Sequence, residues 1–281
     1  MSKKLVITAD DFGISKEAND AILKSFQEGS LTATCLMATG QAFEHAIQEI
    51  WPQCSEIGFG VHLNIIEGKT LQSPNKKSLL YDFDGQYNNG FIQLLANSSN
   101  KKFIDEVETD FRIQIEKVLD KAKVDHLNSH VHTHSIPKIF EITCKLAKEY
   151  GIKYIRTQNE IPYFIPNIQK HLDLRFPVNL IKLGLLKAFS TINLQTLKKY
   201  SLATNEYFVG VSYTSYMDED AIKYGIAKVK EPNSITEVIL HPTTDQSKKD
   251  NYQEFLSITN PELKKYLESS DFELTNYKKL S

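Results

Sequence analysis

The chain has 281 residues, 41% of them hydrophobic, and its 33 basic and 35 acidic side chains give a formal net charge of −2. Without an excess of basic residues there is no electrostatic source for non-specific binding to a phosphate backbone, so we expect no nucleic-acid partner. The length allows two domains of about 150 residues, but an α/β barrel of about 250 residues also folds as one unit.

The three cysteines lie far apart and lack CxxC spacing, which favours free thiols in a reducing compartment over a disulfide framework. The apolar run near the N-terminus ends at Asp10 and Asp11 and is too short for a signal peptide. No other run reaches the 18 or so apolar residues that a membrane span needs. We therefore expect a cytoplasmic protein with no membrane association.

Strand and helix patterns alternate along the chain. The first strand candidate, residues 5–9, stops before the two carboxylates, and a helix capped by Ser15 follows and ends near Gly29. Later strand candidates span residues 31–38, 57–63, 124–129, 152–157, 207–213 and 235–240. Helix candidates span residues 41–51, 103–122, 137–150, 180–200, 218–228, 252–258 and 261–269.

This alternation predicts an α/β fold with a parallel sheet and helices outside it. About seven strands favour a single TIM-like (β/α) barrel over residues 1–281, either complete or lacking a strand. An open doubly wound sheet is the structural alternative. Two long insertions, about 64–102 and 158–206, interrupt the alternation of strands and helices. We expect them to form lids or binding walls rather than surface loops without a function.

Four of the eight histidines lie within nine residues, in the segment HLNSHVHTH at 126–134. His130, His132 and His134 share a face if the strand continues through them, and fan out from a loop if it ends near Ser129. Imidazole is the commonest neutral metal ligand, and three in five residues exceeds what core packing uses. The cluster predicts a metal or catalytic site.

Other polar side chains also follow predicted buried strands: Asp10, Asp11, His62 and His241. Singly, the two aspartates could form a solvated turn, and each histidine could be a hydrogen-bonded core residue. Together with His130 they stand at carboxyl ends of strands, where α/β enzymes place their sites. A mixed carboxylate and imidazole set leaves coordination positions open, which favours metal-assisted hydrolysis.

Four motifs in this order resemble the YdjC-like family, which includes chitooligosaccharide deacetylases: ADDFGIS at 9–15, GFGVHLN at 58–64, the histidine segment at 126–134 and LHP at 240–242. The resemblance extends over most of the chain. It implies a TIM-like barrel and a carbohydrate N-deacetylase, a hydrolase that removes an N-acetyl group from a small sugar or oligosaccharide in a metal-dependent reaction.

Transferred to this sequence, the resemblance implies that Asp11, His62 and His130 are metal ligands. It also implies that Asp10 is the general base and His241 the general acid. One divalent ion is expected, Mg²⁺ by resemblance, while the donor types also suit Zn²⁺, Mn²⁺ or Co²⁺.

Weaker auxiliary or substrate-binding candidates are His132, His134 and Arg156. The family usually reads Asp-Ser-His where this chain has Asn128, and loss of that carboxylate would lower metal affinity or rate if it orients a ligand. Aromatic residues of the insertions are candidates for stacking on sugar rings: Tyr81, Tyr87, Phe91, Tyr163 and Phe164.

Two other functions remain open from the sequence. A metal-dependent phosphoesterase would also place histidines at a barrel rim, but favours several metals and basic phosphate-binding loops. A sugar- or metal-binding homologue with impaired catalysis is the other alternative, motivated by Asn128. The expected partner is a small carbohydrate, and a homodimer is the default assembly.

Overall fold

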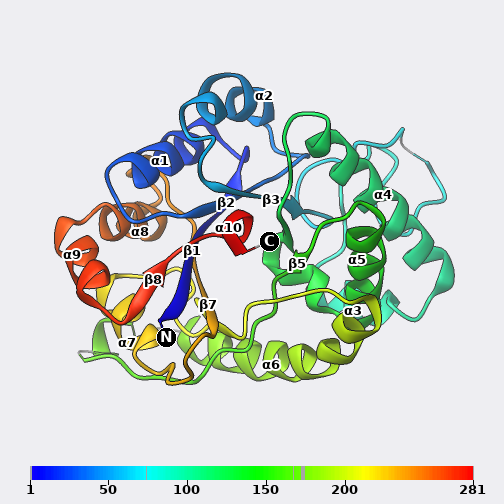
Figure 1. Cartoon of the computed structure of the whole chain (residues 1–281). Coiled ribbons are helices and arrows are strands. Elements are labelled where there is room, and N and C mark those ends of the chain that lie inside the picture. Colours follow the sequence, from blue (N-terminus) through cyan, green and yellow to red (C-terminus); the bar gives the residue numbers. More distant parts are fainter. Residues whose placement is uncertain (1, 74, 167, 172–174, 281) are drawn as a thin grey trace.

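The computed structural model describes residues 2–73, 75–166, 168–171 and 175–280. Its parallel strands form a curled sheet with helices around the outside (Figure 1). Seven strands follow one another in the order β5-β4-β3-β2-β1-β7-β6, and a short β8 pairs with β1 off this path. The strands are β1 Lys3–Phe12, β2 Ala33–Leu36, β3 Gly58–Leu63, β4 His126–Ser129, β5 Tyr154–Ile155, β6 Tyr207–Val209, β7 Ile235–Leu240 and β8 Phe272–Leu274.

The surrounding helices are α1 Lys16–Gln27, α2 Phe43–His45, α3 Phe91–Asn97, α4 Lys101–Leu119, α5 Pro137–Glu149, α6 Arg175–Tyr200, α7 Glu219–Ile226, α8 Lys249–Ile258, α9 Pro261–Ser269 and α10 Tyr277–Leu280. Short helical turns cover Ala46–Ile50, Trp51–Gln53, His130–Ser135 and Ile168–His171. Within the described residues, no helix combines the length and apolarity that crossing a bilayer requires.

The predicted fold class is confirmed as an incomplete TIM-like α/β barrel, and β7 and α9 have the predicted bounds. The two outer strands of the path approach each other, because a parallel bridge joins Glu160, beyond β5, to Phe208 of β6. The N-cap of α1 is also as predicted, since the Ser15 side chain accepts a hydrogen bond from the amide of Ala18.

The prediction that the first strand stops before the aspartates is wrong. β1 continues to Phe12, and its pairing with β2 changes register between Ala9 and Phe12. Asp11 lies in this irregular stretch with a φ of 66°. The extra residue re-aims the side chains at the end of the strand, as β-bulges beside active sites commonly do.

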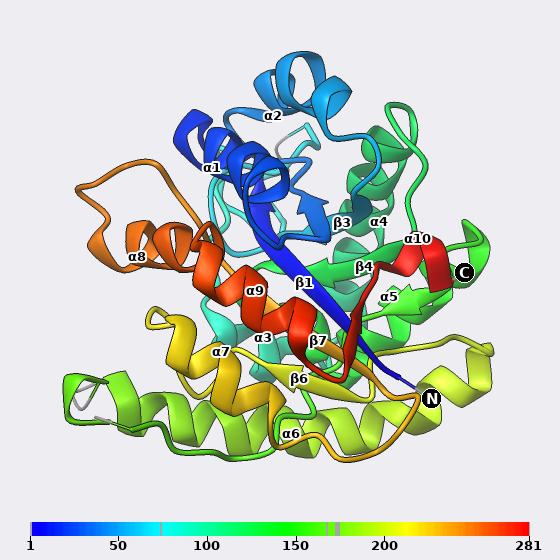
Figure 2. The same ribbon diagram turned by 60° about the vertical axis from the view of Figure 1, so that its left-hand side comes forward.

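The two faces of β1 show how the barrel is built. Leu5, Ile7 and Ala9 belong to the main apolar core, which the helices cover, whereas the alternate residues Thr8 and Asp10 are equally buried but polar. Because side chains alternate along a strand, these polar groups share the opposite face, which is the barrel interior. The interior beside β1 is therefore polar toward the carboxyl end of the strand. Figure 2 shows α1 and α9 beside β1 on the outside of the barrel.

The two insertions contain helices rather than consisting of irregular loops throughout. The first contains α3 and the start of α4, and its Tyr87 donates a hydrogen bond to buried Asp110 over 2.7 Å. The second is largely α6, and its residues 167 and 172–174 lie outside the described part. Among the aromatic candidates, Tyr81, Tyr87 and Tyr163 are buried in the apolar core, whereas Phe164 is 68% exposed.

Candidate active site

Three predicted metal ligands converge at the carboxyl end of the barrel; we call Asp11, His62 and His130 the rim group. Oδ1 of Asp11 lies 3.2 Å from Nε2 of His62 and 2.9 Å from Nδ1 of His130. One donor atom from each of the three lies within 4.8 Å of the others. They come from the ends of β1, β3 and β4, so residues 119 positions apart along the chain are brought into contact.

The ring nitrogens that face away from this centre have acceptors of their own. Nδ1 of His62 lies 2.7 Å from Oδ1 of Asn128, and Nε2 of His130 lies 3.1 Å from Oε2 of Glu67. Metal-binding histidines typically donate their second N–H to such an acceptor, which fixes the ring and its tautomer. Donor types and surroundings of the rim group therefore fit a divalent cation.

The charges of the rim group are mutually dependent. Burial lowers the pKa of His130, but the carboxylates of Asp11 and Glu67 outweigh it and raise that pKa to about 10. Burial raises the pKa of Asp11, but His130 and His62 bring it well below its usual range. An imidazolium thus balances Asp11, and a bound cation would take over that role and release the proton.

Backbone strain occurs in and beside the rim group, at three of the six described non-glycine residues that have a positive φ angle. Asp11, Val131 and His132 all have positive φ angles, of 66°, 53° and 56°. For non-glycine residues this left-handed region is sparsely populated, and such strain gathers at functional sites. β4 ends at Ser129, so the three histidines after it fan out from a turn, which is one of the two predicted geometries.

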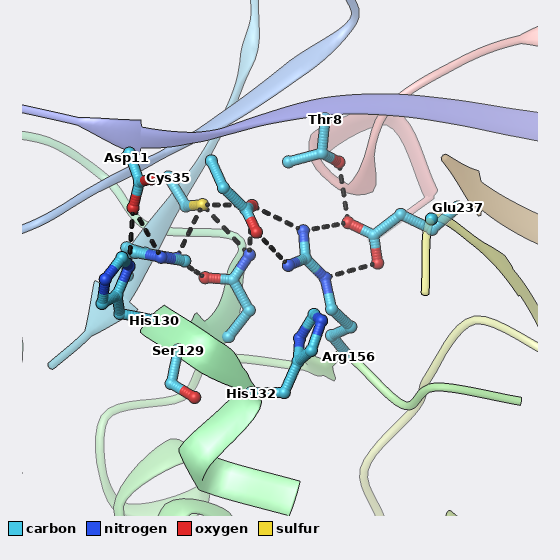
Figure 3. A network of polar contacts seen from close by, with 12 residues as sticks. Thr8, Asp11, Cys35, Ser129, His130, His132, Arg156 and Glu237 are labelled. Carbon is cyan, nitrogen blue, oxygen red and sulfur yellow. Dashed lines mark hydrogen bonds and ion pairs between the residues drawn. The ribbon is translucent and has the colours of Figure 1, made fainter. Parts of the chain in front are cut away.

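Asp10 is buried against Arg156 in the barrel and belongs to what we call the interior network: Asp10, Arg156 and Glu237. Arg156 and Glu237 are labelled in Figure 3. Arg156 donates from Nη1 to Oδ2 of Asp10 over 2.6 Å and from Nη2 to Oδ1 over 2.8 Å. Its Nη2 and Nε also donate to Glu237, over 2.8 and 3.1 Å. All three side chains are at most 2% exposed.

This arrangement holds Asp10 ionised. Burial alone would raise the pKa of Asp10, but the positive charge of Arg156, together with His62, brings it well below its usual range. Planar guanidinium groups bind carboxylates through two parallel hydrogen bonds, which fixes orientation as well as charge. Arg156 therefore holds the Asp10 carboxylate in one orientation, while the predicted auxiliary role of Arg156 in the reaction stays a prediction.

Asn128 connects the rim group to the interior network. Its Oδ1 faces His62, while its Nδ2 donates to Oδ1 of Asp10 over 3.2 Å and to Sγ of Cys35 over 3.0 Å. An amide can accept from one group and donate to another, which an ionised carboxylate cannot do. Asp10, Cys35 and His62 also lie close enough together to hold a metal ion. However, the Asp10 carboxylate is already hydrogen-bonded to Arg156, and Nδ1 of His62 already contacts Asn128.

His241 follows β7 and is held by α8. Its backbone N–H donates to Glu254, whose Oε2 lies 3.6 Å from Nδ1 of the ring, and Asn251 donates to its carbonyl over 2.8 Å. Burial lowers the pKa of His241, but the Glu254 carboxylate outweighs it and raises that pKa to about 9. His241 is therefore an imidazolium at neutral pH, in electrostatic contact with Asp10 and Asp11.

The two histidines predicted as auxiliary residues, His132 and His134, are buried in the wall beside Arg156. His134 lies 2.6 Å from the Ser129 hydroxyl through Nδ1, and its Nε2 lies 3.0 Å from the carbonyl oxygen of Arg156. Burial lowers the pKa of His134 to about 3 and that of His132 well below its usual range. His132 packs edge-on against Phe208, with ring centroids 5.8 Å apart. Both rings are therefore neutral at pH 7.

An α/β barrel with carboxylate and imidazole side chains gathered at the carboxyl ends of its strands is the architecture of a barrel enzyme. The chain belongs to the YdjC-like protein family, whose model matches residues 4–269.

Curated relatives carry a consistent name. A carbohydrate deacetylase of Clostridium beijerinckii is 35% identical over 163 residues, which is 57% of this chain and 63% of that protein, less than two thirds of its length. A carbohydrate deacetylase of Listeria monocytogenes serotype 4b is 29% identical over 99% of this chain and 100% of its own. A solved structure from Enterococcus faecalis V583, named for cellobiose-phosphate cleavage, matches over 100% of both chains with a TM-score of 0.75 and 20% identity, which shows the shared fold alone.

Sequence reasoning missed Glu237, Glu254 and Cys35. Glu237 could have been found from the sequence, because it is a carboxylate inside the buried, β-branched strand Ile235–Leu240. A buried carboxylate needs a charged or hydrogen-bonding partner. Cys35 also lies within a buried strand, but a cysteine there cannot be distinguished by sequence from an ordinary small apolar residue. Glu254 lies on an amphipathic helix where glutamate is common, so only the fold reveals its contact with His241.

Proposed function

We propose that this chain is a metal-dependent carbohydrate N-deacetylase, with residues 1–281 acting as one unit. Water cleaves the amide bond of an N-acetyl group on a small sugar or oligosaccharide, and the products are acetate and a free amine. Membership of the family and the shared name of its relatives support the reaction class. The substrate is uncharged at the reacting amide, which agrees with the near-neutral charge of the chain.

The observation that carries the metal dependence is the rim group. Asp11, His62 and His130 offer three donor atoms that lie within 4.8 Å of one another. The other ring nitrogen of each histidine contacts an acceptor, on Asn128 for His62 and on Glu67 for His130. When bound, a divalent ion polarises the amide carbonyl and lowers the pKa of a water molecule. We expect one ion, Mg²⁺ by family resemblance, or Zn²⁺, Mn²⁺ or Co²⁺ by the donor types.

Asp10 acts as the general base. Arg156 holds its carboxylate ionised and oriented at neutral pH. A carboxylate of low pKa accepts a proton readily only from an acidified water, so this assignment and the metal dependence support each other. The proton leaves the attacking water and moves to a carboxylate oxygen of Asp10.

His241 acts as the general acid. An amine leaves poorly unless its nitrogen is protonated, and the imidazolium of His241 is available up to about pH 9. Its position after β7 is on the same end of the sheet as the rim group, because both follow the carboxyl ends of parallel strands. His132 and His134 are neutral and buried, which makes them weaker candidates for this proton.

The test is acetate release from the N-acetylated disaccharide of chitin, measured with metal-loaded protein, with chelator-treated protein and after metal is restored. We expect acetate release that chelator abolishes and metal restores. Phosphate release from a phosphorylated sugar under the same conditions, without acetate, would show a phosphoesterase instead. Metal binding without either product would show a binding protein that has lost catalysis.

A further inference from the structure

The carboxy-terminal segment closes the amino-terminal mouth of the barrel. β8 pairs with β1, the amide of Thr275 donates to the carbonyl of Leu5 over 2.9 Å, and α10 lies across the centre of the barrel (Figure 1). The family match ends at residue 269, so this segment lies beyond it. It nevertheless reaches the polar interior.

Tyr277 is the residue of α10 that enters the barrel. Its side chain is 1% exposed, and its ring packs on those of His126 and Tyr154, with centroids 4.8 and 4.9 Å apart. The hydroxyl donates to Oε2 of Glu237 over 2.9 Å. A side chain outside the family match is thus bonded directly to the interior network.

Glu237 is held by donors on both of its oxygens. Oε1 accepts from the Thr8 hydroxyl over 2.7 Å and from Nη2 of Arg156 over 2.8 Å. Oε2 accepts from Nε of Arg156 over 3.1 Å and from Tyr277. Thr8 therefore holds one oxygen of the carboxylate and Tyr277 holds the other, and the plane of the carboxylate sets that of the guanidinium that binds Asp10. Thr8, Glu237 and Arg156 are labelled in Figure 3.

We propose that Tyr277 is a positioning residue for Asp10, acting through Glu237 and Arg156. The proposal rests on the proposed function, in which Asp10 takes part in the reaction. Without the Tyr277 hydroxyl, Oε2 of Glu237 keeps one donor, and the carboxylate is free to rotate toward the Thr8 side. Because guanidinium and carboxylate bind as planar groups, such a rotation tilts Arg156 and displaces both of its hydrogen bonds to Asp10.

Tyr154 provides a matched control. Its hydroxyl donates over 2.9 Å to the carbonyl of Leu280, so it anchors the same α10, and its ring stacks on Tyr277. The Glu237 carboxylate takes its hydrogen bonds from Thr8, Arg156 and Tyr277, with Tyr154 not among these donors. Tyr154→Phe therefore also removes a tyrosine hydrogen bond at this end of the barrel but leaves the hydrogen bonds of the interior network in place.

The first measurement compares kcat and KM for acetate release by Tyr277→Phe and Tyr154→Phe. We expect Tyr277→Phe to lower kcat about 10-fold with little change in KM, less than the ~100-fold that a 1 Å misplacement can produce. Tyr154→Phe should keep kcat within about twofold. Equal losses in both variants, or an unchanged kcat in Tyr277→Phe, would overturn the proposal.

If Tyr277→Phe fails to fold, Thr8→Val replaces it, because this substitution keeps the side-chain shape and removes the donor on the other side of Glu237. We expect the same selective loss of kcat from Thr8→Val. A wild-type kcat in that variant would contradict the proposal, since the plane of Glu237 would then not matter to the reaction.

The second measurement needs no activity and so separates failure of this proposal from failure of the proposed function. The chain has three arginines, and Arg156 is fully buried while the side chains of Arg112 and Arg175 are 30% and 48% exposed. We expect the Nε–H resonance of Arg156 to be protected from solvent exchange and to shift in Tyr277→Phe but not in Tyr154→Phe. An unmoved resonance in Tyr277→Phe refutes the link, even if the wild-type protein releases no acetate.

Discussion

The rim group and the interior network carry adjacent aspartates of one strand, yet they are built differently. Asp11 and His130 have side chains that are 15% exposed, and their charges balance only if His130 carries a proton or a cation takes its place. Asp10 is 2% exposed and receives four hydrogen bonds from three side chains, those of Arg156, Asn128 and Cys35.

The difference shows how one β-strand supplies two kinds of carboxylate. Alternation along β1 turns Asp10 inward, where the chain itself satisfies it, and the irregularity after Ala9 turns Asp11 toward the open rim. Under the proposed function, the interior network keeps the base Asp10 in place while a ligand binds to the rim group and leaves it. The predictions below aim to break one half without the other.

Removing the buried cation should have the largest effect. Arg156→Met leaves Asp10 and Glu237 as unpaired buried carboxylates, and loss of one partner of a buried pair typically costs about 3–5 kcal/mol of stability. Urea denaturation measures this change. Arg175→Met is the control, since it breaks a surface pair with Asp250 and should cost less than about 1 kcal/mol. Similar losses in both variants would mean that the interior network does not stabilise the barrel.

Breaking the connection between the two halves should have an intermediate effect. Asn128→Ala removes the acceptor that fixes Nδ1 of His62, and loss of such partners weakens metal binding about 10–100-fold. Titration calorimetry with Zn²⁺ on metal-free protein measures the affinity. The exposed variant Asn88→Ala, in the first insertion, is the control and should bind as the wild type does. Unchanged affinity in Asn128→Ala would show that the ring of His62 needs no support.

The smallest expected effect concerns the general acid. Because His241 has a pKa raised to about 9, it is protonated below that pH, and kcat should fall as the pH rises through about 9. Glu254→Gln removes the charge that raises this pKa, so the fall should begin about one to two pH units lower. The pH dependence of kcat measures it, with the exposed Glu268→Gln as control. If kcat of Glu254→Gln falls at the same pH as that of the wild type, His241 is not the general acid.

The sequence predicted what depends on local periodicity. The strand bounds of Ile235–Leu240, the cap at Ser15 and the placement of polar residues at strand ends all follow from neighbouring residues. Because parallel strands share a direction, the position of a side chain at one strand end also predicted its approach to the others.

What the sequence did not predict depends on contacts across the barrel. Glu237 and Tyr277 are 40 positions apart, and the residues around each give no indication that the two side chains are in contact. β8 and α10, of three and four residues, are too short to leave a periodic signal. The continuation of β1 through Asp11 requires a left-handed φ that a β-strand pattern does not anticipate.

The central claim is that the rim group binds the cation and the interior network orients the base, and the adjacent aspartates test it most directly. Zn²⁺ binding to Asp10→Asn and Asp11→Asn should be measured by calorimetry under identical conditions. We expect Asp10→Asn to retain one bound ion with near wild-type affinity, whereas Asp11→Asn should lose it. Loss of binding in Asp10→Asn together with retention in Asp11→Asn would contradict the division of roles between the two halves of the site.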